Sequence, residues 1–256
     1  MKPAKIKGIS TRIVFPLFLF FEGLLLLAAC SKENKGFATT ADYMSTATSN
    51  DTLKNVTGTK KYLALGDSYT IGTSVSELDR FPAQTTAILN TQGIDLHTEI
   101  IATNGWTTTD LLNATNIQPV SRDYDVVTLL IGVNNQYQGK PLEAYKQEFT
   151  TLLQRSIALA GNQPSHVIVL SIPDYSVTPF ARGRDVAAIA AQIDVFNAVN
   201  KLVAGDYKTQ YLDITGESRK AATDLSLVAS DSLHFSGKEY NIWSYKLVPL
   251  IKAALQ

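Results

Sequence analysis

The 256-residue chain is poor in the residues that build disulfides, metal clusters and nucleic-acid-binding surfaces. A single cysteine excludes an internal disulfide and a cysteine-based metal cluster. The 23 basic and 23 acidic side chains leave no net charge, and phosphate binding needs a clustered basic excess, so we expect no nucleic-acid partner. No histidine and carboxylate group has metal-ligand spacing, and no P-loop or dinucleotide fingerprint occurs. We therefore expect no metal and no cofactor.

The amino-terminal segment predicts export from the cell. Four basic residues precede a long apolar run, and residues 27–30 read Leu-Ala-Ala-Cys, which resembles the lipobox of bacterial lipoproteins. The resemblance implies a signal peptide over residues 1–29, cleavage before Cys30 and attachment of a lipid to its sulfur. An uncleaved membrane anchor with an incidental cysteine is the alternative. Ser31 after the cysteine favours the outer membrane, while the membrane face stays open.

The residues after Cys30 divide into a tether and one domain. Residues 30–59 are rich in serine, threonine, asparagine and lysine and contain few large apolar side chains, which predicts a flexible tether. Residues 60–256 contain enough apolar residues for a globular core, in a chain that is 45% hydrophobic overall. We expect this domain to be a monomer.

Strand-like and helix-like segments alternate through the domain, which predicts an α/β fold with a doubly wound parallel sheet. The expected strands are Tyr62–Leu65, Leu96–Ala102, Asp125–Ile131, Val167–Ile172 and Gln210–Ile214. Apolar residues at helical spacing predict helices around 81–89, 108–113, 142–153, 186–203 and 240–255.

Ser68 is the candidate nucleophile, in the stretch Gly66-Asp67-Ser68-Tyr69 after the first strand. In an open parallel sheet, ligands bind outside the carboxyl ends of the strands, and a glycine permits a tight turn there. The chain lacks G-x-S-x-G, so the nucleophile elbow of the α/β-hydrolases is not the template.

A serine nucleophile needs a base, and the chain offers three histidines. His97 and His166 stand at the amino ends of expected strands, on the edge opposite to Ser68. His234 follows the fifth strand, just before a helix whose start is marked by the capping-box pattern of Ser236 and Glu239. His234 is therefore the candidate base.

Three aspartates are candidates for the acid that orients His234. Asp231 stands three residues before the histidine and has the local reach to bind its Nδ1, so we prefer it. Asp213 and Asp174, which follow the fifth and fourth strands, are the rivals.

Two further strand ends carry candidate oxyanion donors. Gly105 follows the second strand and can offer its backbone amide at close approach. Asn134 follows the third strand and can donate from its side-chain amide.

These blocks together resemble the SGNH hydrolases, also called the GDSL esterase/lipase family. The resemblance runs from about Lys61 to the C-terminus and implies a three-layer α/β/α sandwich on a five-stranded parallel sheet, a flavodoxin-like arrangement. It implies a triad of Ser68, His234 and Asp231, with an oxyanion hole of the Ser68 amide, the Gly105 amide and the Asn134 side chain. Asn135 departs from the family pattern, because many members have aspartate there.

The sequence thus predicts a serine hydrolase that cleaves short-acyl or lipid esters through an acyl-serine intermediate. The alternatives are a carbohydrate or peptidoglycan O-acetylesterase and a non-catalytic binding lipoprotein. Trp106, Tyr137, Tyr175 and Phe180 are expected near the active edge, where they would line an acyl pocket, stack a sugar or merely stiffen surface loops. The expected partners are an acyl-ester or O-acetylated glycan substrate and the membrane through Cys30.

Overall fold

A computed structural model describes residues 58–117 and 123–256. The predicted signal peptide, Cys30 and nearly all of the tether lie outside the described residues, so export and lipid attachment stay predictions.

The described chain contains one five-stranded sheet in which every pairing is parallel, in the order β2-β1-β3-β4-β5. Its strands are β1 (Lys60–Gly66), β2 (Leu96–Ala102), β3 (Val126–Leu130), β4 (Val167–Leu170) and β5 (Gln210–Leu212). All residues of β3 and β4 are buried, as expected for apolar strands covered on both faces. The predicted α/β class and parallel sheet are confirmed.

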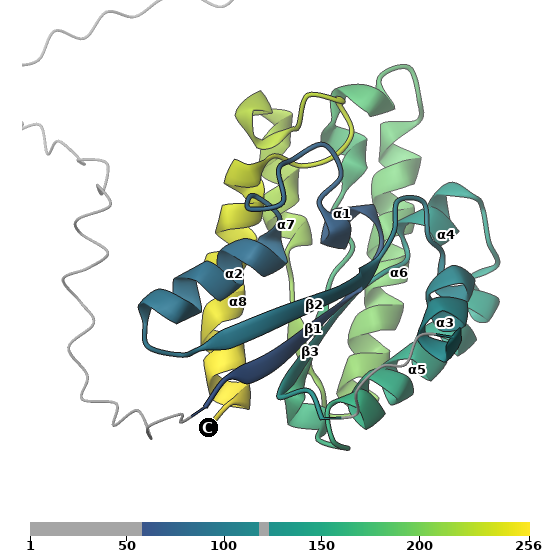
Figure 1. The fold of residues 1–256 in the computed structure, drawn as a ribbon. Helices are drawn as coiled ribbons and strands as arrows, with labels where there is room; N and C mark the ends of the chain where they lie inside the picture. The colour runs from purple at the N-terminus through teal and green to yellow at the C-terminus, as the bar shows by residue number, and fades with distance from the viewer. Residues whose placement is uncertain (1–57, 118–122) are drawn as a thin grey trace, which may run out of the picture. The chain divides into compact units, whose positions relative to one another are not determined.

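Helices cover both faces of the sheet, which makes three layers (Figure 1). The α-helices are α1 (Ser68–Ile71), α2 (Phe81–Thr91), α3 (Thr108–Ile117), α4 (Val133–Tyr137), α5 (Leu142–Leu159), α6 (Val186–Asp206), α7 (Thr215–Ser218) and α8 (Gly237–Ala254). On one side α2 packs against α8, and on the other α5 packs between α3 and α6. The one-turn helices α1 and α4, which no periodicity indicated, begin directly after β1 and β3.

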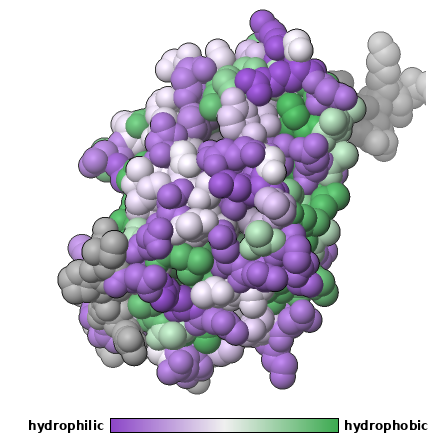
Figure 2. Space-filling view, turned by 90° about the vertical axis from the view of Figure 1, so that its right-hand side faces the viewer, coloured by the Kyte–Doolittle hydropathy of each residue, from purple (hydrophilic) through white to green (hydrophobic). Residues whose placement is uncertain are grey.

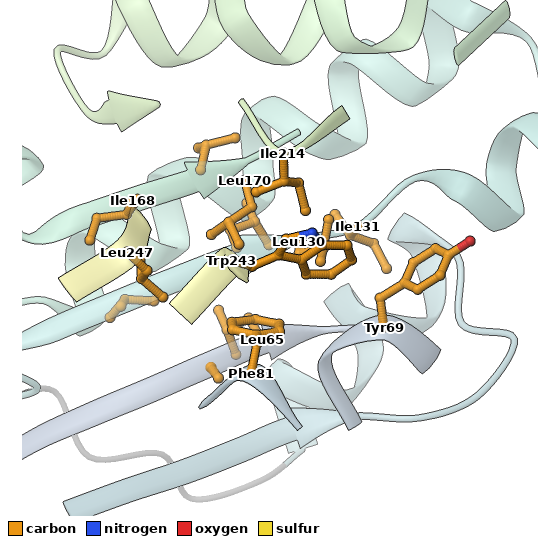
Figure 3. Packing of buried hydrophobic residues seen from close by; sticks show 14 of the residues in the cluster. Leu65, Tyr69, Phe81, Leu130, Ile131, Ile168, Leu170, Ile214, Trp243 and Leu247 are labelled. Carbon is orange, nitrogen blue, oxygen red and sulfur yellow. The ribbon is translucent and has the colours of Figure 1, made fainter. Parts of the chain in front are cut away.

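The core between the sheet and α8 is built around Trp243. Figure 3 shows its indole among Leu65 of β1, Leu130 of β3 and Phe81 of α2, and all four side chains are at most 1% exposed. The indole nitrogen donates to Oε1 of Glu239 at 2.6 Å, so its polar atom is satisfied inside the core. Tyr69 packs edge-on against Trp243 with ring centroids 6.4 Å apart. The core therefore reaches the residue next to Ser68.

Helix α6 is, among the described residues, the one helix long and apolar enough to cross a membrane by length and composition. It packs as a domain helix instead, because Ile193, Phe196 and Val203 are buried against the core. On the face of the molecule shown in Figure 2, hydrophobic side chains form small separate groups among polar ones.

Strand register brings three connections to one edge of the sheet. Gly66, the last residue of β1, pairs with Ala102 of β2 and Leu130 of β3, so the chain leaves all three strands at the same level. The fifth strand is shorter than predicted, because the amide of Ile214 donates to Oγ of Ser171 at 2.8 Å instead of continuing the ladder. The connections that carry the candidate residues thus leave one edge.

Candidate active site

A pocket of about 230 Å³ opens at the carboxyl edge of the sheet. Ser68 and His234, which are 166 positions apart in the chain, both line it. The other lining residues are Tyr69, Asn104, Val133, Asn134, Tyr137, Tyr175, Phe180 and Leu233. The space corresponds to about eight water molecules at roughly 30 Å³ each, so it is small for a ligand pocket.

Ser68 is the first residue of α1 and is 4% exposed. Two residues before Ser68, the backbone of Gly66 has no room for a side chain. A Cβ there would lie 2.5 Å from the Leu130 carbonyl oxygen and 2.1 Å from the Thr70 hydroxyl. Glycine is therefore required here by close packing, whereas the prediction from sequence rested on the tight turn that glycine permits. Because Ser68 begins a helix, its amide has no partner within that helix.

Asp67 directly precedes Ser68 and caps the start of α1. Its Oδ1 accepts the amide of Tyr69 at 3.1 Å, while Oδ2 has no hydrogen-bond partner among the described residues. The side chain is fully buried, and burial raises the pKa of Asp67 to about 7. Ser68 thus follows a carboxyl group that is partly protonated at neutral pH.

His234 lies at the end of a loop and is 6% exposed. Its Nδ1 is 2.5 Å from Oδ2 of Asp231. Its ring meets Tyr69 edge-on, with centroids 5.6 Å apart. Because an ionised carboxylate only accepts hydrogen bonds, Nδ1 carries the proton and Nε2 is left as the acceptor.

Asp231 holds the loop as well as the imidazole. Its Oδ1 accepts the amides of Leu233 at 3.0 Å and His234 at 2.9 Å, and its Oδ2 also accepts the hydroxyl of Ser74 at 2.6 Å. Partial burial alone would raise the pKa of Asp231, but the hydrogen bonds from Ser74, His234 and the loop amides outweigh it and hold that pKa far below its usual value. The carboxylate therefore stays ionised in neutral solution.

The rival acids have other partners. Oδ2 of Asp174 accepts Nε of Arg219 at 2.9 Å, and its Oδ1 accepts the amide of Ser176. Asp213 accepts the amide of Thr215 at 2.9 Å. The hydrogen bond that His234 makes to a carboxylate goes to Asp231, the acid that the sequence favoured.

The other two histidines lie far from this edge in register. His97 pairs with Lys61 near the amino end of β1, and His166 directly precedes β4. Neither lines the pocket.

Gly105 and Asn134 approach the pocket from β2 and β3. Gly105 has φ +83°, and the amide of Trp106 closes its turn by donating to the Thr103 carbonyl at 3.3 Å. Nδ2 of Asn134 donates to the carbonyl of Trp106 at 2.9 Å, which leaves a second proton on that amide. Asn134 lines the pocket, whereas on the Gly105 loop the lining residue is Asn104.

Asn135 links the connections that follow β2 and β3. Its Oδ1 accepts the amide of Thr108 at 3.0 Å, and its Nδ2 donates to the Thr108 hydroxyl at 2.7 Å. An aspartate would keep the first bond but could not donate the second. The asparagine at this position therefore serves the link between α4 and the start of α3.

Three aromatic side chains form one wall of the pocket. Tyr137, Tyr175 and Phe180 contact one another with all three centroid separations at 6.2 Å. Trp106, predicted beside them, is half-buried against the core and is not a lining residue.

The sequence reasoning missed Ser74, Asn104 and Leu233. Ser74 reaches Asp231 across 157 positions, and nothing in its local sequence marks it. Asn104 and Leu233 stand directly before the predicted residues Gly105 and His234, and this position in the chain is the one feature that could have indicated them. Within residues 58–117 and 123–256, no cluster of three or more histidine, cysteine, aspartate or glutamate side chains could hold a metal ion.

Comparison with protein families finds one matching model. The model, described as the GDSL-like lipase/acylhydrolase family, matches residues 64–242. This range includes Ser68, Asp231 and His234. No match to a curated protein sequence was found.

Solved structures share the fold at low sequence identity. An acetylxylan esterase, Axe2 from Geobacillus stearothermophilus, is 17% identical with a TM-score of 0.62 over 77% of this chain and 96% of its own. A lipase/acylhydrolase from Enterococcus faecalis is 19% identical with a TM-score of 0.61 over 75% and 95%. TesA is 17% identical with a TM-score of 0.61 over 76% and 99%. At these identities the likeness shows a common fold.

Proposed function

Because the chain belongs to the GDSL-like lipase/acylhydrolase family, whose members are ester-cleaving hydrolases, we propose that it is a serine esterase acting on short-acyl esters. The observation that carries the proposal is the contact of 2.5 Å between His234 and Asp231 at a pocket that Ser68 also lines. A nucleophile, a base and the acid that orients it are the parts that acyl transfer to serine requires.

In the proposed reaction, His234 Nε2 takes the proton of the Ser68 hydroxyl as the serine oxygen attacks the ester carbonyl. The ionised Asp231 stabilises the imidazolium that forms. His234 then returns the proton to the departing alcohol, which leaves an acyl-serine. A water molecule, deprotonated by the same histidine, attacks the acyl-serine and releases the carboxylic acid and the free serine.

The negative charge on the carbonyl oxygen needs donors during both steps. We assign this role to the Ser68 amide, the Gly105 amide and the Asn134 side chain. Support comes from the free end of α1, from the left-handed turn at Gly105, and from the Asn134 amide proton not used by Trp106. Asn135 would position this hole through Thr108 without touching the substrate.

The size of the pocket favours a short acyl group. A space of about 230 Å³ has room for about eight heavy atoms, so a short acyl chain would fill it together with part of the alcohol, and the rest of the alcohol would lie at the mouth. Tyr137, half exposed at that mouth, offers a ring face on which a sugar could stack. This exposed ring favours an O-acetylated carbohydrate as the natural substrate over a lipid.

Replacing Ser68 tests the proposal. Ser68→Ala should lower kcat/KM for 4-nitrophenyl acetate at least about a thousandfold, because no nucleophile remains, with the thermal midpoint unchanged. Ser76→Ala is the matched control, since Ser76 lies in the connection after α1 and bonds Asp79 instead. Across acyl lengths, activity should be highest at two to four carbons. Residual activity of Ser68→Ala within tenfold of the parent would refute the nucleophile assignment, and a long-chain optimum would refute the short-acyl assignment.

A further inference from the structure

Arg184 stacks on two of the aromatic residues that line the pocket. Its guanidinium carbon lies 4.6 Å from the ring centroid of Phe180 and 5.3 Å from that of Tyr137. One of its terminal nitrogens donates to the Tyr137 hydroxyl at 3.4 Å. The two rings thus hold an exposed cation beside the pocket mouth.

The charge of Arg184 is not neutralised by an ion pair within the described part of the chain. The adjacent carboxylate, Asp185, caps α6 by accepting the amide of Ala188 at 3.0 Å. A guanidinium carries five N–H donors, and the bond to the Tyr137 hydroxyl uses one of them, so the others remain for a bidentate pair of bonds to a carboxylate. Arg184 is therefore prepared for an anion that the described chain does not supply.

The positions of the Tyr137 and Phe180 rings indicate which part of a substrate would carry the anion. Tyr137 and Phe180 line the pocket together with Ser68, whereas Arg184 lies against these rings and does not line it. With the acyl group in the pocket, as the proposed function has it, an alcohol part that leaves across Tyr137 and Phe180 would reach Arg184. A charge recognised there is remote from the scissile bond, and it would aid binding more than the chemical step.

We propose that Arg184 and its aromatic neighbours form a subsite for a carboxylate on the alcohol part of the ester, so that the preferred substrates are O-acetylated sugars of the uronic acid type. The proposal rests on the esterase function and specifies its substrate. The exposed Tyr137 ring would stack the sugar, and the Arg184 fork would bind the uronate carboxylate.

The test compares two substrates that differ in one group. Acetylated methyl glucuronide carries a carboxylate where acetylated methyl glucoside carries a hydroxymethyl group, and acetate release is measured from both. The enzyme should show at least a tenfold higher kcat/KM for the glucuronide, with the difference in KM. Because screening weakens exposed charge pairs, the preference should shrink as sodium chloride is raised.

Variants of two arginines separate a local contact from overall charge. Arg184→Gln should bring the glucuronide-to-glucoside ratio to about one, and Arg184→Glu should invert it. Arg182→Gln is the matched control, since Arg182 belongs to the same connection but lines a separate surface pocket with Pro179 and Val186. It should keep the parent ratio. Thermal midpoints establish that each variant is folded.

Several results would overturn the proposal. A parent ratio near one would do so, as would an equal fall in the two arginine-to-glutamine variants. Arg184-dependent hydrolysis of anionic phospholipid vesicles without a preference between the sugars would place the anion on a lipid instead. Cleavage of 4-nitrophenyl acetate with neither sugar ester turned over would refute the subsite alone. If the folded parent protein cleaved none of these esters, the esterase function itself would be refuted.

Discussion

The serine turn and the histidine loop meet at one pocket but are held in place by different forces. Every residue from Tyr62 to Thr70 is buried, because β1 lies inside the sheet and the turn continues into the core. The loop before His234 is largely exposed. Hydrogen bonds hold it instead: the Ala229 amide donates to the His234 carbonyl at 2.8 Å, and the Phe180 amide to the Ser232 carbonyl at 2.9 Å.

The two environments shift the pKa values of two aspartates in opposite directions. Asp67 has one hydrogen-bonded oxygen in a dry site, and burial raises its pKa to about 7. For Asp231, donors outweigh partial burial, and its pKa falls below its usual range. One carboxyl group is thus partly neutral next to Ser68 while the other stays charged beside His234, a difference that environment alone produces. Replacing Asp231 should therefore affect mainly activity, whereas replacing Asp67 should affect mainly the pH dependence of stability.

The largest effect is expected from Asp231→Asn. The amide would present to His234 Nδ1 either an NH₂ group, which favours the wrong tautomer, or a neutral oxygen, which stabilises the imidazolium less than a carboxylate does. We expect kcat/KM to fall about a thousand- to ten-thousandfold, as measured with 4-nitrophenyl acetate.

Asp213→Asn is the control for this change, because it alters a rival acid that accepts hydrogen bonds from Ser171 and Thr215. It should retain most activity if the protein stays folded. If instead Asp213→Asn were inactive and Asp231→Asn active within tenfold of the parent, the acid of the triad would be misassigned.

The serine side could be predicted from sequence because its signals are local. An apolar strand ending in glycine places Ser68 at the carboxyl edge, and alternation along the chain predicts the parallel sheet, which the structure confirms. His234 could be selected because only three histidines exist and strand polarity places two of them at the opposite edge. Elements of one turn, such as α1 and α4, have no periodicity to detect.

The pairing of His234 with Asp231 is local and could be predicted, but other contacts around the pocket join distant residues, which local patterns do not encode. The hydroxyl of Ser74 meets Asp231 across 157 positions, and Asn135 meets Thr108 across 27. The stacking of Arg184 on Tyr137 likewise joins residues from different connections. The sequence predicts which residues stand at the edge, whereas the folded chain decides which of them touch.

A second, smaller effect is expected from Asp67→Asn, and it concerns stability. A carboxyl group whose folded-state pKa is raised from 3.8 to about 7 binds more protons when folded than when unfolded between these values. Its contribution is fully present below pH 4 and is lost as pH rises toward 7. The parent should therefore lose about 1.4 kcal/mol of unfolding free energy per pH unit between about pH 5 and 6 relative to the variant.

Urea unfolding at several pH values measures this difference as a slope, so a constant cost of the asparagine does not interfere. Asp125→Asn is the control, because Asp125 is a partly exposed carboxylate paired with Lys60. Parallel stability curves for the parent and Asp67→Asn would show that Asp67 is charged in the folded protein and would remove the contrast between the two aspartates.

The smallest effect is expected from Ser74→Ala, which removes one donor from Asp231 and leaves His234 and the two loop amides in place. The remaining bonds keep the carboxylate ionised in neutral solution, so kcat/KM should fall less than tenfold. Because the lost donor stabilised the charged form, the pKa of Asp231 should rise but stay well below neutral pH, so the loss of activity should be the same at every pH between about 6 and 8. Values of kcat/KM measured across this range beside those of Ser76→Ala check both the size of the loss and its independence of pH. A loss as large as that of Asp231→Asn would show that the loop depends on this one distant hydroxyl, not on its own amides.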